Sequence, residues 1–172
     1  METRRQVLGP EHPNTLTSMD NLASTYWIQG QWNEAEKLWL QVMEISKTVL
    51  GAEHPNTLAS MANLASTYQS LGQWNKAEKL EVQVMETRKT VLGAENPDTL
   101  TSMNNLAHTW YSQQRIHEAV TLMEKCVQLR NKILGPSHPD TTSSSRFLSN
   151  WKERVDLLAD KQARAPVQAE SD

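Results

Sequence analysis

The sequence predicts an all-α fold, a solenoid of antiparallel helix pairs, and three observations carry this prediction. The letters NLASTY occupy residues 21–26 and 63–68, and a weaker copy, NLAHTW, occupies residues 105–110, with a step of 42 residues each time. Apolar side chains recur with the period of a helix, and alternation with a period of two is nowhere sustained. A repeat of roughly 20–50 residues indicates stacked units, because one such unit cannot bury its apolar face alone.

The first predicted helix of each unit contains the repeated letters. In the first unit, five side chains share one helical face: Leu16, Met19, Leu22, Ala23 and Tyr26. Asn14, which follows Pro13, is the predicted N-cap of this helix. Gly30 and Gly72 interrupt the pattern, and they suit the left-handed residue that ends a helix.

The second predicted helix of the unit has its own apolar stripe and ends at Gly51. The stripe consists of Ala35, Leu38, Val42, Ile45 and Val49. The connector LGPEHPNTL, which starts at Leu8, returns in variant form at Leu50, Leu92 and Leu134. Residues 8–49 and 50–91 are identical at 31 of 42 positions. Each unit therefore reads as two antiparallel helices joined by a short turn.

The period divides the chain into six segments. We expect residues 1–7 to be the remnant of a preceding second helix, and residues 8–49, 50–91 and 92–133 to be repeats 1, 2 and 3. Residues 134–161 would form a connector and a C-terminal capping helix, and residues 162–172 a disordered tail. Two interpretations of the unfinished N-terminal edge stay open: a piece of a longer array, or an edge that another molecule covers.

Composition excludes several classes of function. The formal charge of −3 and the pI near 6.0 give no basic excess for nucleic acid or an anionic membrane. The longest apolar runs are far shorter than the ~20 residues that span a bilayer. Cys126 is the single cysteine, so an internal disulfide is excluded, and we expect a reducing compartment, most simply the cytoplasm.

No pattern for catalysis, a metal or a cofactor is found. His108 and His117 are nine residues apart without a metal-binding motif, and we expect the second to be exposed at a helix start. His12, His54 and His138 precede prolines, which suits turn residues that bond to local backbone. The serines lack a nucleophile motif, and no phosphate-binding glycine loop is present. We therefore expect a non-enzymatic chain without catalytic residues, metal or cofactor.

Leu22, Ala23, Tyr26, Gly30 and Ala35 resemble the signature of the tetratricopeptide repeat, whose helix pairs stack into a right-handed superhelix. The 42-residue unit with its LGxEHPxT connector resembles kinesin light chain repeats, and more narrowly the repeat tails of fungal NB-ARC, or NLR-like, proteins. The third unit departs from the pattern at Trp110, Gln114 and Ile116, and Glu81 departs in the second. We expect the turn of the third unit to be the loosest.

In tetratricopeptide arrays the first helices line a concave channel, and the position before the signature leucine faces it. The resemblance therefore implies a row of peptide-binding residues in this channel: Asn21, Asn63, Asn105, Ser24, Ser66, His108, Trp27, Gln69 and Tyr111. A carboxamide can bond to a ligand's backbone N–H and C=O at once. Alternatively, the asparagines tie neighbouring helices together. Six further residues are also expected there: Thr17, Asp20, Ala59, Ala62, Thr101 and Asn104.

The leading functional hypothesis is a protein-interaction scaffold that binds a peptide or helix of a partner, as the sensing or autoinhibitory region of an NLR-like protein. Because the channel carries no Lys or Arg, we expect a neutral or mildly basic ligand with an anchor near Trp27. The alternatives are a homodimer through a bare face around Leu16, Met19 and Tyr26, and a kinesin-light-chain-like cargo adaptor.

Overall fold

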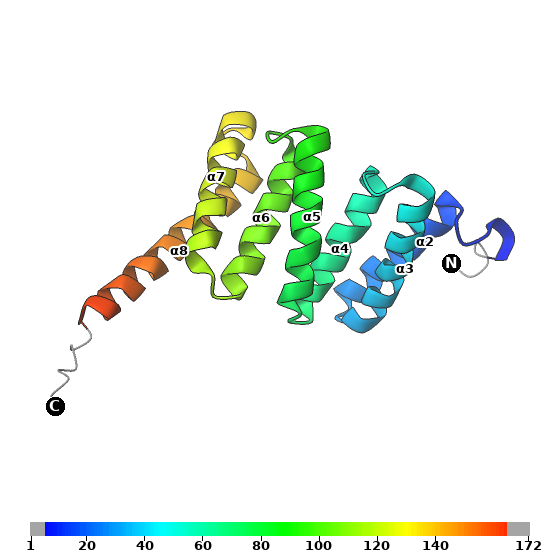
Figure 1. The fold of residues 1–172 in the computed structure, drawn as a ribbon, viewed down its shortest axis with the longest axis horizontal. Coiled ribbons are helices and arrows are strands. Elements are labelled where there is room, and N and C mark those ends of the chain that lie inside the picture. Colours follow the sequence, from blue (N-terminus) through cyan, green and yellow to red (C-terminus); the bar gives the residue numbers. More distant parts are fainter. Residues whose placement is uncertain (1–5, 165–172) are drawn as a thin grey trace, which may run out of the picture.

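The computed structural model describes residues 6–164, and its helices form an extended row of antiparallel pairs (Figure 1). Residues 6–8 are helical. The longer helices are α2 (Pro13–Ile28), α3 (Trp32–Leu50), α4 (Pro55–Ser70), α5 (Trp74–Leu92), α6 (Pro97–Ser112), α7 (Ile116–Leu134) and α8 (Pro139–Arg164). Each packs against the next along the chain, and residues 6–164 contain no strand. The predicted all-α solenoid is confirmed.

The first helices α2, α4 and α6 begin at a proline, and the residue before that proline caps each one. The Nδ1 atoms of His12 and His54 accept the backbone N–H two residues on, at 3.1 Å in both cases. The Asn96 side chain does the same at 2.9 Å, and His138 does so before α8 at 3.2 Å. The prediction of Asn14 as N-cap is therefore wrong by two residues, and the local role expected for the connector histidines is confirmed.

The turn after each first helix needs a residue with positive φ. Gly30 and Gly72 adopt φ values of 73° and 70°, and Gln114 adopts 64° at the equivalent place. Gln114 N–H donates to the Tyr111 carbonyl at 3.0 Å, matching the bond from Gly30 to Trp27 in the first unit. The third turn thus keeps the same backbone bonds, and nothing in its geometry supports the expected loosening.

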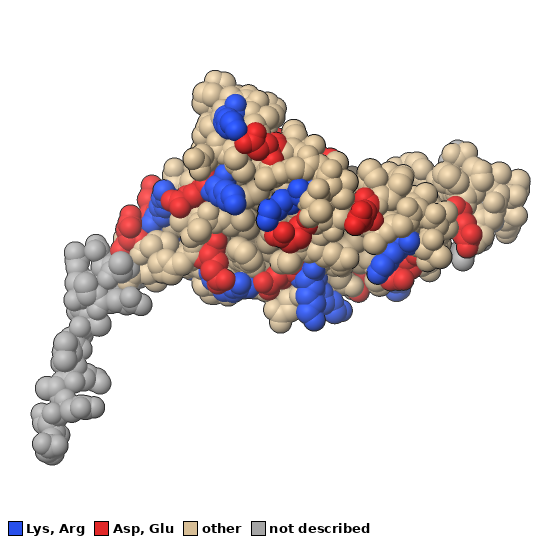
Figure 2. All heavy atoms as spheres, turned by 45° about the horizontal axis from the view of Figure 1, so that its top comes forward, with Lys and Arg blue, Asp and Glu red and all other residues tan. Residues whose placement is uncertain are grey.

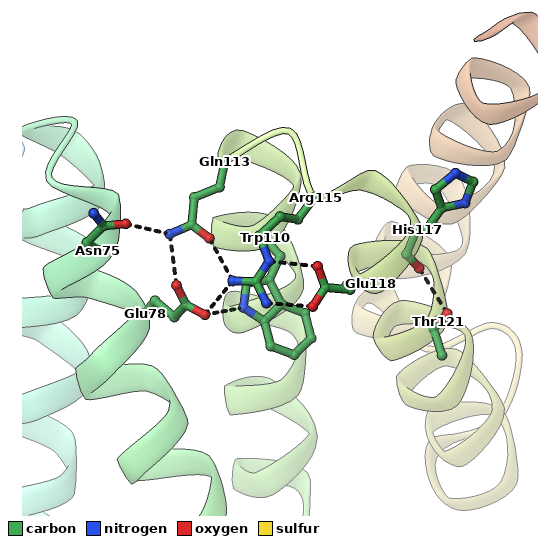
Figure 3. Close-up of polar contacts among 8 residues, drawn as sticks. All are labelled: Asn75, Glu78, Trp110, Gln113, Arg115, His117, Glu118 and Thr121. Atoms are coloured by element: carbon green, nitrogen blue, oxygen red, sulfur yellow. Dashed lines mark hydrogen bonds and ion pairs between the residues drawn. The ribbon is translucent and has the colours of Figure 1, made fainter. Parts of the chain in front are cut away.

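Side chains specific to the third turn add polar contacts to α5 (Figure 3). Arg115 donates to Glu78 and to Glu118, at 2.6 Å in each case, and Trp110 Nε1 donates to Glu78 at 2.8 Å. These bonds, with one from Gln113, hold the pKa of Glu78 below its usual value although desolvation opposes them. The network joins the α6–α7 turn to the preceding helix pair.

The core lies between successive helices, with small side chains where two helices approach closely. Ala23, Ala65 and Ala107, one from each NLASTY copy, are fully buried. Trp39, Glu81 and Met123 occupy one equivalent buried position in α3, α5 and α7. The repeated Leu-Ala pair is thus explained by packing, because a small residue lets the helix axes come within ~8–10 Å.

The ends of the row differ from the predictions in two respects. Leu16 and Met19 are only 7% and 1% exposed, so the predicted bare face around these residues is wrong. The large apolar side chains exposed toward this end are instead Val7, Leu8, Trp27, Ile28 and Trp32. At the other end, α8 continues to Arg164, so residues 162–164 are helical rather than part of a disordered tail. Residues 1–5 and 165–172 lie outside the described residues.

Candidate functional site

The three asparagines of the repeated motif lie on successive first helices, α2, α4 and α6. Asn21 is exposed, and Asn63 and Asn105 are half-buried. Asn63 Nδ2 donates to Asp20 Oδ1 at 3.3 Å, which joins α4 to α2. At least this asparagine ties neighbouring helices together, as the structural alternative expects. We call the surface formed by α2, α4 and α6 around these residues the first-helix wall.

The residues three positions after these asparagines differ between the repeats. Ser24 and Ser66 are half-buried. The His108 ring packs edge-on against Phe147 and Trp151 of α8, with centroid distances of 4.6 Å and 5.0 Å. Burial lowers the pKa of His108, which favours the neutral imidazole at pH 7. His117, in contrast, is exposed near the start of α7, as predicted.

The residues six positions after the asparagines are Trp27, Gln69 and Tyr111. In two of the three repeats their side chains bond to or stack on other side chains. Gln69 Nε2 donates to Glu81 Oε1 at 2.8 Å and to Thr109 Oγ1 at 2.7 Å. Tyr111 stacks on Trp151 with centroids 4.5 Å apart. Trp27 is 38% exposed. Of this predicted set, Trp27 offers the more accessible surface to a ligand.

Helix α8 covers the C-terminal end of the first-helix wall. Phe147 stands 42 residues after Asn105, so an aromatic ring takes the place of the next asparagine. Phe147 and Trp151 pack on His108, and Arg154 lies over the Tyr111 ring at 5.4 Å and donates to its hydroxyl at 3.2 Å. The accessible part of the wall is therefore its N-terminal part, on α2 and α4.

A pocket of about 430 Å³ opens in this N-terminal part, between α2, α3 and α4. Three of its lining residues, Thr17, Asp20 and Ala59, were expected to face the channel. The other lining residues are Glu11, Pro13, Leu16, Val42, Ser46, Val49, Leu50, His54 and Asn56. We call this cavity the α2–α4 pocket.

Sequence reasoning missed the α3 residues at the base of the pocket, although a signal for one of them was available. Ser46 aligns with Arg88 and Arg130 in the 42-residue register, so a long side chain is replaced by a short one. Ser46 as a whole is 2% exposed and lines the pocket. The pocket lies where one repeat differs from the others, at Ser46. The predicted row was instead inferred from the asparagines that all three repeats share.

A second depression, of about 560 Å³, lies between the start of α5 and the α6–α7 turn. Gly72, Trp74, Glu78 and Arg115 are among its lining residues, and, like the α2–α4 pocket, it is lined by none of the nine predicted binding residues. Three of its polar residues, Glu78, Gln113 and Arg115, already bond to one another in the network of Figure 3. The α2–α4 pocket is therefore the stronger candidate for a ligand.

Charge over the molecule is mixed rather than divided into regions of one sign. Figure 2 shows Lys and Arg interspersed with Asp and Glu on the face in view. Within the α2–α4 pocket the described lining residues include two acidic side chains, Glu11 and Asp20, and no Lys or Arg. The pocket thus favours a neutral or positively charged group.

Neither a metal centre nor a membrane span emerges from the described residues. In residues 6–164 no group of three or more His, Cys, Asp or Glu side chains is arranged to hold a metal ion. None of the helices in the same range combines the length and hydropathy needed to cross a bilayer. Cys126 is buried, which raises the pKa of its thiol.

The fold and the repeat now define the class, a helical repeat protein with a ligand-sized pocket in its first-helix wall. The tetratricopeptide repeat family matches residues 1–38, 21–90 and 99–140. This chain belongs to the tetratricopeptide repeat family. Among curated proteins, none matches the chain.

Solved structures support the same family assignment and indicate which kind of tetratricopeptide repeat this chain resembles. Two crystal structures of a Podosopora anserina putative kinesin light chain with nearly identical TPR-like repeats are 31% and 32% identical, with TM-scores of 0.75 and 0.74. In both cases the match covers 95% of this chain and 84% of the other. The predicted similarity to kinesin-light-chain-like repeats is confirmed.

Two more distant structures share the fold alone. BtubC (BKLC) from P. vanneervenii is 18% identical over 92% of this chain and 68% of its own, with a TM-score of 0.73. The Sgt2 TPR domain from Aspergillus fumigatus is 17% identical over 94% of this chain and 91% of its own, with a TM-score of 0.64. The helix-pair stack thus persists where few residues are shared.

Proposed function

We propose that the chain is a protein-interaction scaffold whose first-helix wall binds an extended peptide or a helix from a protein partner. The observation that carries the proposal is the α2–α4 pocket, which opens at the accessible end of a wall with a carboxamide on each of the first helices α2, α4 and α6. Such groups bond to a peptide backbone whatever the ligand's side chains are. The tetratricopeptide fold is consistent with this role, and the proposal includes no catalytic step, metal or cofactor.

The nine predicted residues enter this proposal unequally. Asn21, Ser24 and Trp27 on α2 and Ser66 on α4 are at least partly exposed, and they would contact the ligand directly. Asn63 would contact it while keeping its bond to Asp20. Asn105, Gln69, His108 and Tyr111 lie in or near the part that α8 and the inter-repeat bonds occupy, so their contribution would be smaller.

The biological setting is part of the proposal and rests on the connector motif. The LGxEHPxT connector supports a place in the sensing repeat region of a fungal NLR-like protein in the cytoplasm, and the kinesin-light-chain-like relatives support a cargo adaptor instead. In both settings the chain binds protein rather than nucleic acid or membrane. A protein partner in the wall is common to the two.

A peptide library displayed on phage and selected against the full chain tests the proposal for partner segments of any sequence. We expect selected peptides to bind the double variant N63A/N105A about 5- to 10-fold more weakly, because the lost Asn63 contact contributes on the order of 1 kcal/mol and the Asn105 contact contributes less. The matched control Q83A/Q128A removes two exposed carboxamides from the second helices α5 and α7 and should leave affinity unchanged. Unchanged affinity of N63A/N105A with a lower melting temperature would restrict the asparagines to a structural role.

A specific observation favours one alternative function, self-association. Trp27, Ile28 and Trp32 are 38%, 78% and 39% exposed and lie close together in sequence around the α2–α3 turn. Apolar side chains gathered at a surface often mark an interface. Light scattering of the wild type and of I28S/W32S over a range of concentrations tests it: a dimer of the wild type that the variant loses supports the homodimer.

A further inference from the structure

We call the contact between two neighbouring first helices a junction: the first joins α2 and α4, the second α4 and α6, and the third α6 and α8. At the second and third junctions, the intervening second helix, α5 or α7, provides an arginine. Arg88 of α5 donates from Nη1 to the Asp98 carbonyl at 3.2 Å and to Ser102 Oγ at 2.9 Å. Arg130 of α7 makes the equivalent bonds, to the Asp140 carbonyl at 3.0 Å and to Ser144 Oγ at 2.6 Å. Both junctions therefore contain a guanidinium-binding site that the chain fills with its own side chain.

The first junction, between α2 and α4, has the same arrangement of helices, but α3 provides no arginine at the equivalent position. Ser46 of α3 stands where Arg88 and Arg130 stand, and it lines the α2–α4 pocket. Asn56 and Ser60 are the counterparts of the acceptor residues, and Asn56 also lines the pocket. Ser60 Oγ donates to the Thr57 carbonyl at 2.9 Å, which leaves its oxygen able to accept. The frame that holds a guanidinium elsewhere is retained here.

The first junction also differs in charge, because it carries an additional acidic side chain that would complement a cation. Asp20 lines the pocket, whereas its counterparts in the second and third units are the uncharged Ala62 and Asn104. Trp39 Nε1 and Asn63 Nδ2 both donate to Asp20 Oδ1, at 2.8 Å and 3.3 Å, and no described residue bonds to Oδ2. The junction that lacks its own cation thus carries an additional carboxylate with one oxygen available.

We infer that the α2–α4 pocket binds the guanidinium group of an arginine side chain in a partner segment, between Asp20, the Asn56 carbonyl and Ser46. This inference rests on the proposed function, which supplies the peptide that carries the arginine. A guanidinium fits better than an ammonium, because its planar fork of donors can reach a carboxylate and a carbonyl together. The pocket's volume of about 430 Å³ leaves room for the aliphatic stem against Leu16, Val42 and Val49.

Titration of the ¹⁵N-labelled full chain with N-acetyl-arginine methylamide tests the site with a defined probe. We expect shifts of the amide signals around Asp20, Asn56 and Ala59, and affinity about tenfold higher than for the citrulline analogue, which has the same shape without the charge. The lysine analogue should fall between the two. Equal affinity for the arginine and citrulline analogues would overturn the inference.

Two variants with a matched control locate the binding. S46R places in α3 the residue that Arg88 and Arg130 provide elsewhere, so it should fill the pocket, raise the melting temperature and abolish arginine binding. T48R adds the same charge at an exposed neighbouring position and should retain binding. D20N keeps the Oδ1 acceptor for Trp39 and should weaken binding about tenfold. Full binding by a folded S46R, or by D20N, would overturn the site.

The test separates this inference from the proposed function. If peptides from the library lose affinity in N63A/N105A but bind S46R as they bind the wild type, the scaffold function stands and the arginine pocket fails. If the arginine analogue binds in an S46R-sensitive manner but the library yields no peptide that depends on the asparagines, the pocket stands and the function proposed for the wall fails.

Discussion

The first and third junctions of this molecule have the same helical frame and opposite contents. Between α2 and α4, Ser46 leaves a pocket of about 430 Å³ with the Asp20 carboxylate at its side. Between α6 and α8, Arg130 is 5% exposed and bonds to Asp140 and Ser144, while Phe147 and Trp151 cover His108. One junction is open to a ligand and the other is filled from within.

The repeat fixes the backbone of both junctions, and the side chains at a few positions decide whether each junction is open or filled. Residues 8–49 and 50–91 agree at 31 of 42 positions, so the helices and caps recur almost unchanged. Position 46, with its counterparts at 88 and 130, determines whether the junction is filled. The position of Trp39, Glu81 and Met123 determines how polar the adjacent core is.

Glu81 is a buried carboxyl group at the position that Trp39 and Met123 occupy in the other repeats. Its replacement should have the largest effect on stability. Burial raises the pKa of Glu81 to about 7, from an ordinary value of 4.5, and one of its oxygens has no hydrogen-bond partner. Because the folded pKa is the higher one, the stability from the protonated form is complete below about pH 4.5 and is lost as pH rises through about 7. E81Q, which keeps an acceptor for Gln69, should be more stable than the wild type by about 3 kcal/mol at pH 8 and by little at pH 4.5.

Urea unfolding at the two pH values measures this difference. The control E53Q changes an exposed glutamate in the second connector and should alter neither curve appreciably. A gap between E81Q and the wild type that does not depend on pH would show that Glu81 is ionised in both states, contrary to this account.

Arg130 and Ser46 provide the most direct comparison of the two junctions by mutation. R130A removes a buried guanidinium and leaves the Asp140 carbonyl and Ser144 hydroxyl without it, so we expect a loss of about 2–3 kcal/mol in the free energy of unfolding. S46A changes an already open junction and should cost less than about 1 kcal/mol. R146A, at an exposed position of α8, is the control for charge. Equal losses for R130A and S46A would contradict the contrast between a filled and an open junction.

Replacement of Gln114 should give the smallest effect, because it relieves strain at one backbone position and removes one exposed bond, which Arg154 donates to the Gln114 side chain. A residue other than glycine at φ 64° is strained by about 1 kcal/mol, so Q114G should raise stability by up to about that amount. The reverse change, G72A, meets nothing within 4 Å of its new Cβ and should lose a similar amount through φ alone. Thermal unfolding of both variants checks the sign, and a destabilised Q114G would mean that the Gln114 side chain stabilises the turn.

The helix pairs could be predicted because each of their determinants recurs at a fixed spacing. The stripes around Leu22 and Val42 define the two helices, and Gly30 and Gly51 mark their ends. The N-caps were misplaced because Asn14 has a typical capping side chain, whereas His12 acts through its ring nitrogen on the far side of Pro13. That preference depends on the geometry of the turn, which composition does not reveal.

The candidate site could be predicted only in part, because its properties come from differences between the repeats. The row of asparagines was visible in the sequence, and Asn63 lies beside Asp20 in the wall. The engagement of Gln69 with Glu81 and Thr109 depends on which side chains meet across two junctions. The closure by Phe147 and Trp151 requires the position of α8 on α6. Alignment of Ser46 with Arg88 would have indicated the pocket from sequence alone.

Mapping a library-selected peptide on the ¹⁵N-labelled chain tests the central claim, that equivalent helices stack to form one binding wall. We expect the largest amide shifts on α2 and α4, strongest around Asp20 and Ala59, weaker shifts on α6, and none on the outer positions of α5 and α7. Shifts confined to the second helices, or concentrated at the α6–α7 turn around Arg115, would contradict it.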